Sequence, residues 1–487
     1  MKKFLLLAIC ALSVCLTGCS DNDTPEQLPD PELTLAPDAP IVFPAEGGSV
    51  EITVTTNMES WNAVSDQKWC NVAVSAGKFT VSAVKNETPE AMPAATVTVT
   101  ATSGERSVSR ELQVSQEAGK EKYTDLSREG TSNCYLVTAA GNYSFDATVR
   151  GNGATTEGLD APTAIAGTSA AVVWQSAPGL ISGVTLADGR ISFKIAGPGN
   201  AVIAVKDIKG NIVWSWHIWV CNDEITAHDH IDSEGKVAAV IMDRNLGALN
   251  NTPMDVGNRG MFYEWGRKDP FTPSRSPYHA NTDGNNVPAY NEPNTAIGDG
   301  TGTWVYNAQA AVLATPPANI PNSILNPMTY LQSPYNGHAD WYCTGTDPKA
   351  THPGLWGPEK TIFDPCPPGY KVPGPDLWGI PAGNNSITNG GAAADYDETG
   401  VSVKWDWNAY EDCGRRWKNT GDYYPMAGNI YYTDYISVSI CNYTGGMAFY
   451  WTAQATPDAT KSSAYFVNFN PNWCNYRLGE HDCSAQI

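Results

Sequence analysis

The feature that most constrains the fold is a series of short segments in which apolar and polar residues alternate. The segments Glu51–Thr56 and Ala95–Ala101 both alternate with a period of two. Successive side chains of a β-strand point to opposite faces, so this period is typical of strands with one buried face. No long stretch repeats apolar residues at the spacing of an amphipathic helix. Because 44 glycines and 34 prolines punctuate the chain, it is predicted to be mainly β.

The first residues have the charge order of a secretory leader. Two lysines precede an apolar run, Phe4–Leu16, that is too short to span a bilayer. The run ends in Leu16-Thr17-Gly18-Cys19, which resembles the lipobox of bacterial lipoproteins. The resemblance implies that residues 1–18 are a signal peptide and that the Cys19 thiol carries a lipid anchor. An ordinary cleaved signal peptide with an incidental cysteine is the alternative.

Residues 19–32 form an acidic, proline-rich segment that is predicted to be a tether, because such a composition cannot bury a core. Its start, Ser20-Asp21-Asn22-Asp23, resembles the surface-export signals of Bacteroidetes lipoproteins. That resemblance implies a lipid-anchored protein of the outer membrane that faces the cell exterior. A plain solvated tether is the alternative, and the two interpretations are compatible.

The charge of the chain limits its partners. The net charge is −21, and loss of two lysines with the signal peptide makes the mature chain more negative still. Nucleic acid needs a basic face, so a nucleic-acid partner is not expected. Electrostatic docking on anionic lipid is disfavoured for the same reason.

Residues 33–119 are predicted to form a small β-sandwich. The order Gly47-Gly48, Trp61, Trp69 and the ending Val114–Gly119 resembles the BACON domain, a module named as Bacteroidetes-associated, carbohydrate-binding and often N-terminal. The resemblance implies an Ig-like sandwich. The two tryptophans would be either sugar-stacking platforms or core residues, and the small size of the sandwich favours the core.

Residues 127–235 are predicted to form a second β domain. A turn at Asp207–Asn211 separates two strand-like runs, and the second run holds Trp214, Trp216 and Trp219. These rings could line a binding face. Their alternation along the strand instead favours a strand that is covered on both sides.

Residues 236–487 are predicted to form one larger α+β domain with long loops. Five of its segments stand out: Met242–Ala248, Gly260–Phe271, Asp364–Pro373, Phe449–Ala453 and the strand Ala464–Phe469. They resemble the Fibrobacter succinogenes major paralogous domain, which implies a fold distantly similar to the C-type-lectin and formylglycine-generating folds. The chain departs from that family in a long region between Phe271 and Phe363. It also stops inside a strand predicted to begin at Ser484, which would leave a sheet edge unpaired.

Several clusters have ligand-type side chains without a complete motif. The segment His228–Asp232 could bind a transition metal if extended, but a solvated loop is favoured. The tripeptide Glu292-Pro293-Asn294 matches a lectin calcium signature, yet no downstream Trp-Asn-Asp accompanies it. No metal is assigned, and no cofactor is expected beyond an unproven structural calcium. Its oxygens would come from Asp376, Asp395, Asp397, Asp406, Glu411 and Asp412.

Nine of the twelve cysteines remain after the leader and Cys19 are set aside, so at least one should be unpaired. Any disulfide is expected in the C-terminal part, where five cysteines are concentrated. Their spacing matches no zinc pattern. These residues are Cys366, Cys413, Cys441, Cys474 and Cys483.

No catalytic motif is identifiable, so no catalytic residue is assigned and an enzyme is not expected. The favoured function is non-catalytic binding or adhesion, with a glycan as the leading ligand and a surface protein as another. A structural cell-surface or fimbria-associated subunit is the alternative, and an enzyme on the C-terminal domain a further one. Aromatic faces bind the C–H groups of sugars. The candidate glycan-binding rings are Trp265, Trp378, Trp405, Trp407, Trp451 and Trp473.

Overall fold

The computed structural model describes most of the N-terminal half of the chain and several separate stretches of the C-terminal half. It divides into two compact units, Met1–Lys122 and Tyr123–Ile487, which we call unit 1 and unit 2. The described residues are 29–88, 90–119, 122–155, 165–221, 223–231, 235–253, 255–272, 289–291, 294, 319–329, 354–374, 377, 387–388, 396–397, 414–417, 423–434, 437–442, 447–457, 462–469, 474–480 and 484–485.

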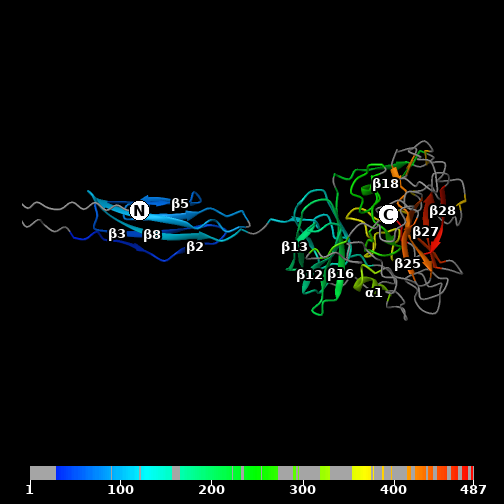
Figure 1. Cartoon of the computed structure of the whole chain (residues 1–487), viewed down its shortest axis with the longest axis horizontal. Coiled ribbons are helices and arrows are strands. Elements are labelled where there is room, and N and C mark those ends of the chain that lie inside the picture. The colour runs from blue at the N-terminus through cyan, green and yellow to red at the C-terminus, as the bar shows by residue number, and fades with distance from the viewer. Residues whose placement is uncertain are drawn as a thin grey trace, which may run out of the picture. The chain divides into compact units, whose positions relative to one another are not determined.

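Unit 1 is a sandwich of two four-stranded sheets (Figure 1). One sheet has the order β1-β3-β6-β5 and the other the order β2-β8-β7-β4, with β2 and β8 parallel. The predicted β-sandwich is thus confirmed. Its strands are β1 (Leu33–Ala36), β2 (Ile41–Phe43), β3 (Gly48–Thr56), β4 (Ser60–Ser65), β5 (Cys70–Ser75), β6 (Lys78–Ala83), β7 (Ala95–Ser103) and β8 (Arg106–Gln116).

The alternation in the sequence explains the core of unit 1. Along β7 the residues Ala95, Val97, Val99 and Ala101 are fully buried, while the threonines between them are half-buried. A tight turn joins β5 to β6, where Ser75 pairs with Lys78. The period-two pattern therefore gives both the strands and the face that each one buries.

The first part of unit 2 is built from two further four-stranded sheets with the orders β10-β16-β15-β12 and β13-β14-β11-β9. Phe145 lies 6.0 Å from Phe193 and 5.1 Å from Trp216, measured between ring centroids, and links the two sheets. The strands are β9 (Thr124–Asp125), β10 (Cys134–Val137), β11 (Gly141–Asp146), β12 (Ser169–Gln175), β13 (Ile181–Ala187), β14 (Arg190–Ile195), β15 (Gly199–Lys206) and β16 (Ile212–Val220).

Strand β16 is covered on both sides, as predicted. The rings of Trp214, Trp216 and Trp219 are all fully buried. Trp219 donates a hydrogen bond of 2.8 Å from Nε1 to the Ala248 carbonyl, so the segment after residue 236 packs on this strand. The same hydrophobic core includes Trp216 and Trp451. The predicted domain boundary at 235/236 therefore falls inside a single compact unit.

In the described stretches of the rest of unit 2, most of the regular elements are strands. The structure does not show the predicted α+β domain: in the described stretches after residue 236 there is one α-helix, α1 (Asn319–Leu325), and one 3-10 turn, η1 (Val256–Asn258). The helical component of that prediction came from the family resemblance and not from any helical periodicity. No helix among the described residues is long and apolar enough to cross a membrane.

The sheets of this part are the hairpin β17-β18, the four-stranded sheets β19-β29-β24-β25 and β20-β28-β27-β26, and the three-stranded sheet β21-β22-β23. The late strand expected at Ser484 is β29, and it pairs with both β19 and β24 instead of forming an open edge. The bounds are β17 (Ala227–Ile231), β18 (Val237–Met242), β19 (Tyr263–Glu264), β20 (Ile387–Thr388), β21 (Tyr396–Asp397), β22 (Gly414–Trp417), β23 (Tyr423–Pro425), β24 (Asn429–Asp434), β25 (Ser437–Asn442), β26 (Ala448–Pro457), β27 (Ser462–Phe469), β28 (Cys474–Glu480) and β29 (Ser484–Ala485).

Candidate functional site

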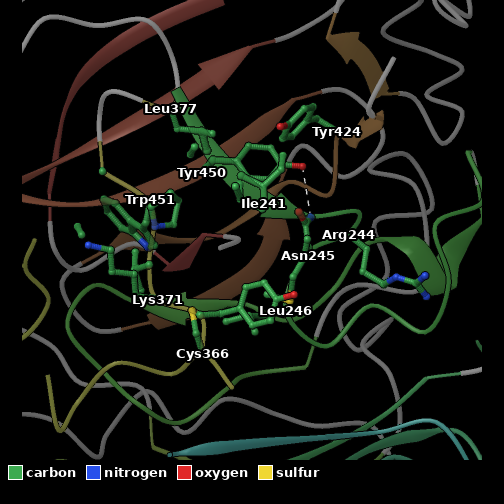
Figure 2. Close-up of a pocket in the computed structure, with 18 of the residues that line it drawn as sticks. Ile241, Arg244, Asn245, Leu246, Cys366, Lys371, Leu377, Tyr424, Tyr450 and Trp451 are labelled. Carbon is green, nitrogen blue, oxygen red and sulfur yellow. Dashed lines mark hydrogen bonds between the residues drawn. The ribbon is translucent and has the colours of Figure 1, made fainter. Parts of the chain in front are cut away.

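A cavity of about 680 Å³ lies in unit 2 where three segments that are distant in the sequence meet. The first is β18 with the following residues 243–246, the second is the loop 366–374, and the third is residues 450–454 of β26. Each of the three overlaps a segment that carried the family resemblance in the sequence. Figure 2 shows these segments around the cavity, with the Tyr450 hydroxyl directed towards Asn245.

One carboxylate and one ammonium group shape the loop 366–374. Asp364 accepts hydrogen bonds from the backbone N–H of Cys366 at 2.8 Å and of Val372 at 2.9 Å, so it links the two ends of the turn. Lys360 donates to the Asp364 carboxylate at 2.6 Å and to the carbonyls of Cys366 and Tyr370, each at 2.8 Å. Charge-assisted hydrogen bonds of this kind hold the loop in one conformation.

The segment after β18 is fixed by its side chains. Asn245 donates from Nδ2 to the Arg259 carbonyl at 3.1 Å and to the Tyr450 hydroxyl at 3.3 Å (Figure 2). Gly260 makes this close approach feasible, because a Cβ there would lie 2.6 Å from Asn245 Cβ and its φ is +75°. A side chain at position 260 would therefore displace the wall of the cavity.

Aromatic rings form much of the cavity wall. Tyr424, Tyr450 and Trp451 are buried, whereas Tyr370 and Tyr423 are half-buried and are therefore more accessible to solvent. Burial raises the pKa of the Tyr450 hydroxyl well above its usual value, so the group stays neutral and can donate a hydrogen bond. A wall of this composition offers apolar ring faces together with a few hydroxyl groups.

Two of the six predicted glycan-binding tryptophans lie in the core and not on an open surface. Trp265 and Trp451 are each 1% exposed, and their rings pack against Trp356 and Phe466. Trp451 does form part of the inner wall of the cavity. The remaining four lie outside the described residues: Trp378, Trp405, Trp407 and Trp473.

The other sequence candidates fall in three groups. The segment His228–Asp232 was expected to be a solvated loop, but its first four residues lie in β17. There His230 is fully buried, 3.2 Å from the Tyr424 hydroxyl. The buried face of the β17-β18 hairpin explains the difference. Within the described part of the chain no group of acids, histidines and cysteines could hold a metal ion. Cys19 and most of the proposed calcium ligands lie outside that part.

The side chain of Asn294, from the lectin-like tripeptide, is hydrogen-bonded within the protein. Its Oδ1 accepts from the Gly179 N–H at 2.7 Å and from Gln175 Nε2 at 3.0 Å, which joins it to the end of β12. Of the five C-terminal cysteines among which any disulfide was expected, Cys366 is a buried free thiol. The side chains of the other four are not described.

A buried Cys–His–Asn arrangement was not predicted. His217 faces Asn200 Oδ1 at 2.9 Å through Nε2, so Nδ1 accepts from the Tyr263 hydroxyl at 3.2 Å and lies 3.5 Å from Cys134 Sγ. Burial lowers the pKa of His217 to about 3 and raises the pKa of the Cys134 thiol well above its usual value. Both groups are therefore neutral and enclosed, and the arrangement stabilises the fold rather than activating a nucleophile.

The cavity itself could not be located from the sequence. The sequence did not identify Tyr370, Tyr424, Tyr450 and Asn245 as site residues, although three of them belong to segments that carry the family resemblance. The only available signal was the presence of aromatic residues in three otherwise unrelated segments.

The comparisons with known proteins bear on unit 1. The family model of the viral BACON domain matches residues 32–115. Residues 32–115 are a BACON domain. A BACON domain is consistent with a role in carbohydrate binding. No curated protein matches the chain.

In the BACON domain both tryptophans are half-buried and pack against the core. The Trp61 ring lies 6.1 Å from that of Phe79, and Trp69 donates from Nε1 to the Pro93 carbonyl at 2.9 Å. Most of each ring is therefore covered by the core, in agreement with the favoured prediction.

Solved structures resemble the chain only weakly. A chimeric titin Z1Z2 carrying an exogenous decorin peptide shares 10% identity with a TM-score of 0.15, over 39% of this chain and 97% of the other. Protocadherin gamma C5 EC1-3 shares 12% identity with a TM-score of 0.18, over 39% and 68%. An endo-fucoidan hydrolase of glycoside hydrolase family 107 shares 15% identity with a TM-score of 0.14, over 37% and 32%. At these TM-scores nothing about this protein follows from its neighbours.

Proposed function

We propose that the protein is a lipid-anchored cell-surface protein of the outer membrane that binds a carbohydrate without catalysis, and that the cavity of unit 2 holds the sugar. The observation that carries the proposal is the cavity of about 680 Å³ with five aromatic residues in its wall. Ligand sites of small molecules have volumes of roughly 300–1,000 Å³. One or two sugar rings would fit such a volume.

The chemistry of the wall suits a sugar. A pyranose ring has an apolar face of C–H groups that packs on an aromatic ring, and its hydroxyls need hydrogen-bonding partners at the edge. Tyr370 and Tyr423 supply half-buried rings, and Gln454 supplies an amide at the same cavity. The BACON domain supports the same ligand class.

The absence of an assigned catalytic group is part of the proposal. The Cys134–His217 pair is enclosed, and neither residue lines the cavity. Of the acids in the described part of the chain, only Asp243 lines the cavity, whereas glycoside hydrolysis uses a pair of carboxylates across the bond.

The test is a broad glycan array probed with the chain from Ser20 onward, which keeps every described residue. We expect selective binding to a subset of glycans. The Tyr370→Ala variant should lose it, because the ring that the loop 366–374 contributes to the cavity wall is removed. Tyr143→Ala is the matched control: Tyr143 is also half-buried, but it lies on β11 and does not line the cavity.

Both variants must retain the wild-type circular dichroism spectrum. If the folded wild-type protein bound no glycan on the array, the carbohydrate proposal would be overturned. It would favour a structural cell-surface role.

A further inference from the structure

The charged side chains that line the cavity are Asp243, Arg244 and Lys371. Arg244 donates from Nε to Asp243 at 2.7 Å and from Nη1 to Asp223 at 3.0 Å, and its side chain is fully buried. In Figure 2 it extends away from the labelled aromatic rings. The guanidinium is thus already paired with two carboxylates, so few of its N–H groups remain for a ligand.

The Asp243 carboxylate also has hydrogen-bond partners within the protein. Besides Arg244 it accepts a hydrogen bond of 3.1 Å from Asn251 Nδ2, and its side chain is only 12% exposed. Its Oδ2 also accepts a hydrogen bond of 3.4 Å from the Thr226 N–H, so a ligand hydroxyl would have to compete with three donor residues.

Lys371 differs from both. It is exposed, it belongs to the loop 366–374, and its ammonium donates to the carbonyl of Pro358, another residue of the cavity wall. It forms no ion pair with any described residue. An ammonium has three donors, so two N–H groups remain for a ligand. Lys371 is therefore the one charged group of the described cavity wall that is not neutralised by a partner.

We infer that the sugar bound in this cavity is acidic, with a carboxylate or sulfate group that pairs with Lys371. The inference rests on the proposed function and narrows it to one class of saccharide. The neighbouring residue Tyr370 is half-buried and lines the same cavity, so a single ring can contact the tyrosine while its anionic substituent reaches the ammonium.

The overall charge of the protein makes this local cation more significant. A chain with a net charge of −21 repels anions at long range, although salt screens charges beyond about 10 Å. Affinity for an acidic sugar therefore requires a cation in direct contact. Such a contact should be sensitive to salt, because an exposed ammonium is screened by ions.

The experiment compares matched saccharides by calorimetry with the chain from Ser20 onward. The probes share one backbone: a galactose oligomer, the corresponding galacturonate oligomer and a 6-sulfated galactose oligomer. Equivalent neutral, uronic and sulfated sets replace them if the array selects another backbone. We expect the acidic forms to bind about tenfold more tightly than the neutral form, as expected for a charge-assisted contact. The stronger of the two acidic forms identifies the anion.

Lys371→Met removes the charge and keeps the length of the side chain. It should abolish the preference for acidic probes, so that the acidic and neutral forms bind this variant with similar affinity. Lys209→Met, at an exposed lysine in the turn before β16, is the matched control and should retain the preference.

Each failure points to a different conclusion. Equal binding of neutral and acidic probes, or an acidic preference that survives Lys371→Met, overturns this inference and leaves the proposed function standing. Absence of binding by every probe, with the array silent as well, overturns both.

Discussion

The side-chain amide of Asn245 donates a hydrogen bond of 3.3 Å to the hydroxyl of Tyr450. This contact joins the segment after β18 to β26 across 205 residues of sequence. The same hydroxyl donates at 2.9 Å to the Pro425 carbonyl at the end of β23. One buried phenol thus joins β26 to the segment after β18 and to β23 beside the proposed sugar site.

Tyr450→Phe tests that role. The variant keeps the ring and leaves the Pro425 carbonyl without this donor in the interior. We expect the free energy of unfolding of unit 2 to fall by about 1–3 kcal/mol, the cost of a buried group that has lost its partner. Tryptophan fluorescence during denaturation reports mainly on unit 2, because only two of the 16 tryptophans, Trp61 and Trp69, lie in unit 1.

The control is Tyr370→Phe. The Tyr370 hydroxyl has no hydrogen bond to any described residue, so its removal should change stability by no more than about 0.5 kcal/mol. Equal effects of the two substitutions would show that the Tyr450 hydroxyl does not hold the walls together.

The buried pair Lys268–Asp269 provides a second stability prediction. Lys268 Nζ lies 2.8 Å from Asp269 Oδ1, 2.5 Å from Ser215 Oγ and 4.6 Å from the centroid of the Trp214 ring. Lys268→Met leaves the carboxylate buried without its cation, and this should cost roughly 3–5 kcal/mol. Adding Asp269→Asn removes the orphan charge and should recover part of that loss. A double variant no more stable than Lys268→Met would refute the account of the pair.

The buried imidazole of His217 should make stability depend on pH. Its pKa is about 3 in the folded protein, against an ordinary value of 6.5. The unfolded chain therefore binds the proton more readily, and this residue lowers the free energy of unfolding as the pH falls from 6.5 towards 3. The slope from this residue approaches about 1.4 kcal/mol per pH unit.

His217→Gln removes the titration. We expect the difference in unfolding free energy between wild type and variant to shrink as the pH falls below 6.5 and to be constant above pH 7.5. Denaturant titrations at several pH values measure both. A difference that is independent of pH throughout would mean that the imidazole is already charged, or exposed, in the folded protein.

The lipid anchor is testable in cells. Cys19→Ala removes the thiol that the thioether needs, so labelling of the protein by radioactive palmitate should disappear, as should its recovery with membranes. Cys15→Ala, within the apolar run, should leave both unchanged. Labelling that persists without Cys19 would contradict the proposed anchor.

The sequence predicted local structure well where one face of a strand is buried. The alternation in Ala95–Ala101 correctly gave β7 and its buried face, and the run of Trp214 to Trp219 correctly gave a strand covered on both sides. The His228–Ile231 strand was missed, because its ligand-type residues resemble a polar loop and the tyrosine beside His230 comes from residue 424.

The cavity and its supports depend on contacts that no local pattern reveals. Asp364 bonds to a residue eight positions away, but Asn245 and Tyr450 are far apart in the chain. The predicted tryptophans illustrate the same limit. Trp265 and Trp451 are large apolar rings whose indole N–H groups donate to the backbone carbonyls of Thr452 and Tyr263. Because these N–H groups have acceptors, both rings can be buried in the core.

The central claim is that a saccharide occupies the cavity of unit 2, and amide hydrogen exchange tests it most directly. The chain from Ser20 onward would be exchanged with and without a saccharide selected on the array. The account predicts slower exchange in residues 241–246 and 366–374 and in β26, with residues 32–115 unchanged. Protection confined to residues 32–115, with the cavity segments unaffected, would place the sugar on the BACON domain and contradict the account.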